Sequence, residues 1–161
     1  IHTSRSGWAV DNFLVQDPMG QPFHEAQQLG RIKKSIGDAL ANRVELAPRL
    51  AQRPLPISRS KAFDVEPRVL VDNKASNRFS VIEVNARDRP ALLNRLARTL
   101  FEHQLIVHSA HITAYGERAA DTFYVTDVIG GKITAQNRVD TITQALLDAA
   151  SDARQAELES V

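Results

Sequence analysis

Residues 79–93 read FSVIEVNARDRPALL, a β-rich run followed directly by a helix start. The run over 78–85 predicts a strand. Asp88 and Pro90 predict the beginning of a helix, because aspartate caps helix N-termini and proline is tolerated in the first helical turn. Apolar residues then recur at helical spacing until about His103, which predicts a helix with one apolar face. That face comprises Leu92, Leu93, Leu96, Ala97 and Leu100.

The following residues predict a hairpin and a second helix. Residues 106–115 and 119–128 are rich in β-branched and aromatic side chains, and Gly116 lies in the turn between them. The order strand, helix, strand, strand, helix is typical of a ferredoxin-like α+β sandwich, an antiparallel sheet with its helices on one face. The last helix is predicted by apolar residues at helical spacing, namely Val139, Ile142, Leu146 and Ala149.

This sandwich lacks a fourth strand after its last helix. Residues 152–157 are too polar and too helix-prone to form one. Residues 65–72 are a candidate strand, and Pro67 would place it at a sheet edge or near the strand's start. The pattern leaves open which sheet this strand completes.

A seven-residue pattern occurs twice, as DNFLVQD over residues 11–17 and as DTFYVTD over residues 121–127. In both copies a glycine follows three residues later, at Gly20 and Gly130. Recurrence of a pattern predicts two copies of one structural unit. We interpret the repeated aspartates as strand-end residues that belong to the scaffold of each unit.

The first copy shows the elements of only half a unit. Residues 9–17 alternate apolar and polar, which predicts a strand running into a turn, and residues 25–42 predict a helix. Because patterned sequence precedes the motif only in the second copy, we expect a truncated first unit and a chain that is a fragment. The expected segments are half a unit over 1–42, a linker over 43–77, a second unit over 78–150 and a polar tail over 151–161.

Composition predicts a globular protein with one ordinary domain or two small ones, given 161 residues of which 43% are hydrophobic. Twenty Lys and Arg against 19 Asp and Glu leave a net charge of +1, which gives no electrostatic reason to expect nucleic acid or a membrane as partner. The chain has no cysteine, so disulfides and thiolate metal sites are excluded. It also shows no bilayer-spanning apolar run and no signal-peptide pattern, and we expect a soluble, cytoplasmic protein.

Three stretches of the second unit closely resemble an ACT domain, namely residues 79–93, residues 109–118 (SAHITAYGER) and residues 121–127. The resemblance extends to residues 63–69 (FDVEPRV) and to Asp72-Asn73. These flanks resemble the C-terminal tandem ACT region of the family of bifunctional protein-PII uridylyltransferase/uridylyl-removing enzymes of proteobacterial nitrogen regulation. The resemblance covers nearly the whole chain up to the polar tail.

The resemblance implies a regulatory region that senses glutamine as an allosteric ligand. In that family, nucleotidyltransferase and metal-dependent hydrolase domains lie upstream and use a divalent metal such as magnesium. Neither domain is in this chain, so we expect no catalytic residue, metal site or cofactor here. The implied partners are glutamine, the catalytic domains of the same chain and the PII protein, and an open sheet edge leads us to expect a homodimer of this chain.

The loop from Asn85 to Leu92 is the implied ligand site, because free backbone N–H groups and the positive end of the helix dipole favour a carboxylate there. Asn85 and Asp88 would take the ammonium or amide of an amino acid, and the N–H groups of Ala91 and Leu92 its carboxylate. Ala91 stands where the family usually has glycine. For Asp88 alone, helix capping is the alternative. The expected ligand-binding set is Asn85, Ala86, Arg87, Asp88, Pro90, Ala91, Leu92, His111 and Thr113.

His111 and Thr113 join this set because the corresponding ACT strand faces a neighbouring unit across the ligand. His108 and His111 also have the spacing of a zinc motif, but residues three apart on a regular strand point to opposite faces, which favours structural roles. Arg87 and its neighbour Arg89 are expected to be solvated loop charges.

Two other functions remain open. The ACT units could be interaction or dimerisation modules that bind no ligand. An independent enzyme of acylphosphatase type could use Asn85 and Arg87 on oxyanions, although no Gly-rich phosphate loop accompanies them.

Overall fold

The computed structural model describes residues 2–4, 8–17, 19–23, 25–46, 49 and 65–151. These residues fall into two compact units, one made of residues 11–54 and the other of the remaining residues. The strands are β1 (His2–Thr3), β2 (Ala9–Val10), β3 (Arg68–Asp72), β4 (Ser80–Arg87), β5 (Ile106–Tyr115) and β6 (Arg118–Thr126). The helices are α1 (Ala26–Leu40), α3 (Leu92–Glu102) and α4 (Gln136–Ala150).

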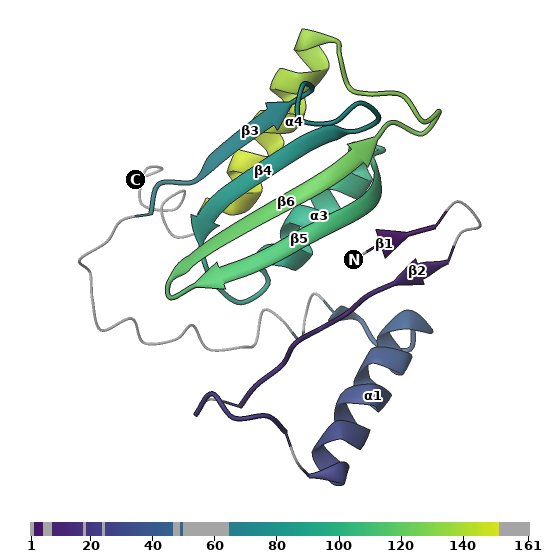
Figure 1. Cartoon of the computed structure of the whole chain (residues 1–161), viewed down its shortest axis with the longest axis vertical. Helices are drawn as coiled ribbons and strands as arrows, with labels where there is room; N and C mark the ends of the chain where they lie inside the picture. Colours follow the sequence, from purple (N-terminus) through teal and green to yellow (C-terminus); the bar gives the residue numbers. More distant parts are fainter. Residues whose placement is uncertain are drawn as a thin grey trace. The chain divides into compact units, whose positions relative to one another are not determined.

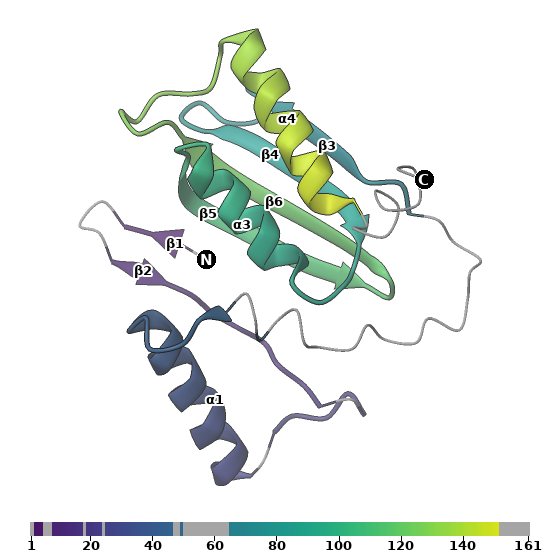
Figure 2. The same cartoon turned by 180° about the vertical axis from the view of Figure 1, so that it is seen from behind.

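The larger unit is the expected ferredoxin-like sandwich. Its six strands form one sheet in the order β2-β1-β5-β6-β4-β3, and every neighbouring pair is antiparallel (Figure 1). The helices α3 and α4 lie together on one face of the sheet, as the reverse view shows (Figure 2). We call the other face the helix-free face. The hairpin predicted around Gly116 is confirmed, because Tyr115 of β5 pairs with Arg118 of β6.

The core lies between the sheet and its two helices. Side chains of a strand point alternately to its two faces, so every second residue of the central strands is buried against the helices. Ile82 of β4 and Phe123 of β6 lie opposite each other and are both buried. Burying a leucine fully contributes about 2 kcal/mol, and three leucines of α3 are buried. They are Leu92, Leu96 and Leu100, whereas Ala97, expected on the same face, is exposed.

β3 completes the sheet of this unit and settles where the candidate strand pairs. It runs antiparallel to β4, from the pair Arg68–Asn85 to the pair Asp72–Val81. Pro67 directly precedes the strand, at the sheet edge where a residue without an N–H is tolerated. The fourth strand of the sandwich was expected after α4 in the sequence. Its place in the sheet is taken by β3, which comes before β4.

The repeated Asp and Gly form the same turn in both units. The carboxylates of Asp17 and Asp127 each accept the backbone N–H groups of the residues two and four positions later, at 2.7 to 3.0 Å. Gly20 and Gly130 follow with φ of 78° and 87°, a left-handed conformation that glycine adopts without strain. Each turn precedes a helix of 15 residues, α1 or α4. The repeat thus encodes an Asp-anchored turn that leads into a helix.

The strand expected over residues 9–17 is wrong beyond Val10, where β2 ends. A strand needs a hydrogen-bonded neighbour, and the segment after Val10 has none within the described part of the chain. Its apolar side chains are accordingly exposed, Leu14 by 99%.

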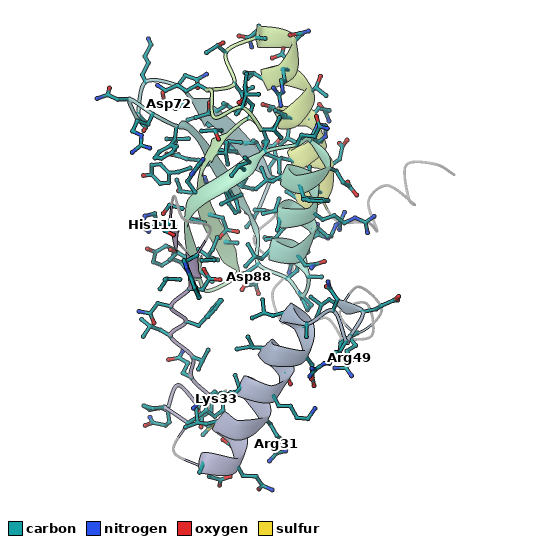
Figure 3. The ribbon with its side chains drawn as sticks, turned by 90° about the vertical axis from the view of Figure 1, so that its right-hand side faces the viewer. Arg31, Lys33, Arg49, Asp72, Asp88 and His111 are labelled. Carbon is teal, nitrogen blue, oxygen red and sulfur yellow. The ribbon has the colours of Figure 1, made fainter. Side chains whose placement is uncertain are left out.

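The helix expected in the smaller unit is confirmed as α1. Figure 3 shows Arg31 and Lys33 projecting from it, and both side chains are exposed. No residue of α1 is buried, and Leu40 of its apolar stripe is 81% exposed. An ion pair of 2.7 Å between Lys34 and Asp38 joins successive turns on its polar side.

Candidate functional site

The loop between β4 and α3, residues 88–91, is held against the turn of the β5–β6 hairpin. The backbone N–H of Asp88 donates to the carbonyl oxygen of Glu117 at 2.8 Å. The Arg87 guanidinium lies 3.4 Å from the Glu117 carboxylate. The Asp88 side chain itself is exposed on the segment that leads into α3 (Figure 3). The loop therefore presents one carboxylate beside the N-terminus of a helix.

The N-terminus of α3 carries no side-chain cap. Ala91 occupies the N-cap position, so the expectation that Asp88 caps the helix is wrong. The N–H of Leu92, one of the two proposed for a ligand carboxylate, already donates to the Arg89 carbonyl at 3.2 Å. The N–H groups of Ala91 and Leu93 lack intrahelical acceptors, because no helical carbonyl precedes the first turn. Together with the helix dipole, they favour a bound anion.

Ala91 adopts the left-handed conformation, with a φ of 68°. In this region the Cβ of an L-residue approaches a carbonyl oxygen, at a cost of about 1–2 kcal/mol. Glycine has no Cβ and avoids that cost. Glycine would therefore suit this position without strain. With alanine the loop still adopts the left-handed conformation, but the backbone at Ala91 is strained.

We expect Ala91→Gly to raise the free energy of unfolding by about 1 kcal/mol, because glycine relieves the left-handed strain. Urea denaturation of the variant and the wild type measures this difference. Ala97→Gly is the matched control, since Ala97 is exposed on α3 and its replacement should lower stability by about 1 kcal/mol. A loss of stability in Ala91→Gly as well as in Ala97→Gly would show that the backbone at Ala91 is not strained.

Arg89 is not the solvated loop charge that we expected. Its guanidinium donates to the carbonyl oxygens of Ala149, at 3.0 Å, and of Ser151. These carbonyls belong to the C-terminal end of α4, where intrahelical donors run out and the negative end of the dipole favours a cation. Arg89 thereby ties the loop between β4 and α3 to the end of α4.

The expected site residues lie on both sides of the sheet. Asn85 pairs with Ala120, which in turn pairs with Thr113, so Asn85 and Thr113 share the helix-free face. His111 is exposed on that face (Figure 3). Its ring lies 6.0 Å from the ring of Tyr124.

The other members of the set lie in the loop or the core. Pro90 and Ala91 are half-buried in the loop, whereas the side chains of Ala86 and Leu92 are buried. The last two can meet a ligand only through their backbone.

His108 and His111 lie on the same face, so the expectation that they face opposite ways is wrong. A bulge between Val107 and Ser109 inserts one residue into β5 and shifts the alternation. His108 therefore contacts Phe79, with ring centroids 4.8 Å apart, and bonds to the Thr126 hydroxyl at 2.9 Å. Burial and the charge of nearby Arg78 lower the pKa of His108.

The sequence interpretation misplaced Asp121, which it took for a strand-end residue. It lies within β6 rather than at its end, and its side chain is 3% exposed. Burial raises its pKa to about 6, and the charge of Asp88 adds to this rise while a backbone hydrogen bond from Thr113 opposes it. The spacing contained a signal: Asp121 shares its strand face with the buried residues Phe123 and Val125.

Two hollows lie elsewhere on the larger unit. One of about 400 Å³ lies at the outer edge of β3 and includes Asn85 and Leu147 in its lining. Another of about 450 Å³ lies between α3 and α4. Within the described ranges, no group of three or more His, Asp or Glu is arranged to hold a metal ion. None of the helices described is long and apolar enough to cross a membrane.

Comparisons with known proteins agree with this architecture. The family model that describes the N-terminal ACT domain of the ACR family matches residues 75–153. No solved structure matches the chain.

Several curated proteins named bifunctional uridylyltransferase/uridylyl-removing enzyme are similar to nearly the whole chain. That of Erythrobacter litoralis is 74% identical over 159 residues, which are 99% of this chain and 17% of that protein. Those of Novosphingobium aromaticivorans and Zymomonas mobilis are 66% and 50% identical, over 94% and 98% of this chain and 17% of each relative. The chain thus spans about a sixth of the length of these relatives. The resemblance seen in the sequence is confirmed: residues 75–153 form an ACT domain, and nearly the whole chain is similar to one segment of the bifunctional uridylyltransferase/uridylyl-removing enzymes.

Proposed function

We propose that this chain is the glutamine-sensing regulatory region of a bifunctional uridylyltransferase/uridylyl-removing enzyme that modifies the PII protein. The observation that carries the proposal is the loop between β4 and α3, in a chain that is 74% identical over 159 residues to one segment of a protein with that name. That loop combines an uncapped helix N-terminus with the exposed carboxylate of Asp88. A zwitterionic amino acid has complementary charges, since its carboxylate suits the helix N-terminus and its ammonium suits the acid.

Arg89 supplies the physical connection that regulation requires. A ligand alters a distant activity only if it binds one global state of the protein better than another. Because Arg89 joins the ligand loop to the last carbonyls of α4, a shift of the loop also changes the end of that helix. The catalytic domains of the same polypeptide would read this change, and PII would be their substrate.

Isothermal titration of this chain with glutamine tests the proposal. We expect saturable heat at one site and at least roughly tenfold weaker binding by Asp88→Asn, which loses a charge-assisted hydrogen bond. Asp140→Asn is the matched control, because Asp140 is an exposed aspartate of α4. Glutamate serves as the control ligand, since it differs from glutamine only in its side-chain charge. Absence of heat with glutamine would contradict ligand binding.

A second candidate is an interaction module without a ligand, and the helix-free face favours it. Phe79 and Tyr124 are 6.4 Å apart between ring centroids on this face, and His108 and His111 flank them. Aromatic residues are enriched at protein interfaces. Light scattering measures the mass: a dimer disrupted by Tyr124→Ser, together with no heat from glutamine, would favour this function over ligand sensing.

A further inference from the structure

Asp121 is a buried residue of β6. This strand begins at the end of the sheet where β4 leads into α3 (Figure 2). The Asp121 side chain lies opposite Val84 of β4 and Ile112 of β5, and therefore points to the helix-covered side. Arg87 and Arg118, which pair with each other, point to the helix-free face. The Oδ1 atom of Asp121 is buried and has no hydrogen-bond partner among the described residues. An acceptor of this kind is rare in folded proteins and calls for an explanation.

The charged groups around Asp121 leave its own charge uncompensated. Asp88 in the loop is close enough for its carboxylate to repel that of Asp121. Arg89 and Arg95 direct their guanidinium groups to carbonyl oxygens of α4, Arg95 to that of Asp148 at 3.4 Å. The neighbouring residues of β4 and β5 on this side are apolar. A carboxylate with one unpartnered oxygen thus lies near a second carboxylate.

The loop and the neighbouring strand β6 carry three unfavourable features: the Oδ1 atom of Asp121 without a hydrogen-bond partner, the like charge of Asp88 near it, and the left-handed conformation of Ala91 in the loop. Such features persist where the surrounding structure holds them, and they concentrate at functional sites. A cationic N–H donor between the two carboxylates would satisfy Oδ1 and remove the repulsion.

We propose that Asp121 and Asp88 together bind the ammonium group of the amino-acid ligand, and that this binding is coupled to the release of a proton from Asp121. The inference rests on the proposed function and specifies its ligand as a zwitterion whose carboxylate lies at the N-terminus of α3. Asp121 then has two roles. It belongs to the repeated pattern, and it binds the ligand in the larger unit, which contains the loop.

The sign of the coupling follows from which form of Asp121 the ligand prefers. An ammonium group stabilises the ionised carboxylate, so binding lowers the Asp121 pKa from its value of about 6 in the free protein. Below that pH the ligand must displace a proton, and the affinity falls. We expect the Kd for glutamine to rise roughly tenfold from pH 7 to pH 5 and to stay constant above pH 7.

Isothermal titration with glutamine between pH 5 and pH 8, in two buffers of different ionisation enthalpy, measures the proton release directly. The wild type should release a fraction of one proton per ligand at pH 6 and none at pH 8. Asp121→Asn should release none at any pH and should bind at least roughly tenfold more weakly at pH 7. Asp140→Asn, the exposed-aspartate control, should behave as the wild type does.

The outcomes separate the two proposals. No heat from glutamine at any pH overturns both ligand sensing and the role of Asp121. Heat without proton release at pH 6, or the same release in Asp121→Asn as in the wild type, overturns the role of Asp121 and leaves ligand sensing intact. Proton release that disappears only in Asp121→Asn supports the inference.

Discussion

Asp121→Asn is expected to raise the free energy of unfolding by about 1–3 kcal/mol at pH 7.5. Folding raises the pKa of Asp121 from 3.8 to about 6 by burial, which corresponds to about 3 kcal/mol when the group is fully ionised. Asparagine has nearly the same shape and carries no charge, so it escapes this cost. The range is wide because the new amide N–H groups also need acceptors in the interior.

The pH dependence of the stability difference distinguishes the removal of a buried charge from a change in side-chain packing. A carboxyl group with a raised pKa in the folded state binds more protons there, so it reduces stability as the pH rises from about 4 to about 6. The reduction is complete by about pH 7, one unit above the pKa of Asp121 in the folded state. The stability difference between variant and wild type should therefore grow by about 2 kcal/mol from pH 4.5 to pH 7.5.

Urea denaturation at both pH values measures this difference, and Asp140→Asn provides the control, whose difference from the wild type should stay constant. A constant difference for Asp121→Asn as well would contradict a raised pKa. If the variant is more stable and binds glutamine less well, Asp121 is a residue at which binding is favoured over stability.

Arg89→Met is expected to lower the free energy of unfolding by about 2 kcal/mol. It removes two charge-assisted hydrogen bonds to the last carbonyls of α4, in a half-buried position. Methionine keeps much of the apolar stem, so the loss reports the guanidinium rather than packing. Hydrogen exchange should show faster opening of the last turn of α4, and urea denaturation should show the loss of stability.

Arg98→Met is the matched control for this prediction. Arg98 is exposed on α3, and its ion pair with Glu102, at 2.7 Å, joins two residues four apart. Such surface pairs contribute only about 0.3–0.5 kcal/mol. Equal losses for the two variants would show that Arg89 does not secure α4. We further expect weaker glutamine binding for Arg89→Met, because the loop is then free to leave its position.

Local patterns predicted the elements of the larger unit well, because their causes lie within a few residues of sequence. The helical spacing of Leu92, Leu96 and Leu100 fixed the buried face of α3, and Gly116 marked the hairpin turn. The Asp and Gly of the repeat were recognised as a pattern, although their shared turn became clear only from the hydrogen bonds of Asp17 and Asp127.

Features that depend on distant neighbours escaped prediction. The pairing of β3 depends on which sheet edge is available, and the faces of His108 and His111 depend on a bulge that the alternation of β5 does not reveal. Within the site, the exposed loop around Asp88 was predicted. The contact of Arg89 with α4, some 60 residues away, was not, because sequence spacing carries no record of it.

The place of β3 in the sheet makes the domain a circular permutation of the order in which the fourth strand follows the last helix. Pro67, at the start of β3, and Leu147, near the end of α4, line the same hollow, so the chain enters and leaves the domain at one corner. A unit with adjacent ends can be inserted into another polypeptide, or reconnected, with little disturbance of its core. Arg89 contacts the carbonyl of Ser151 near that corner. The loop between β4 and α3 is therefore linked to the point where the chain leaves the domain. Under the proposed function, a ligand that moves this loop would change the structure at that point.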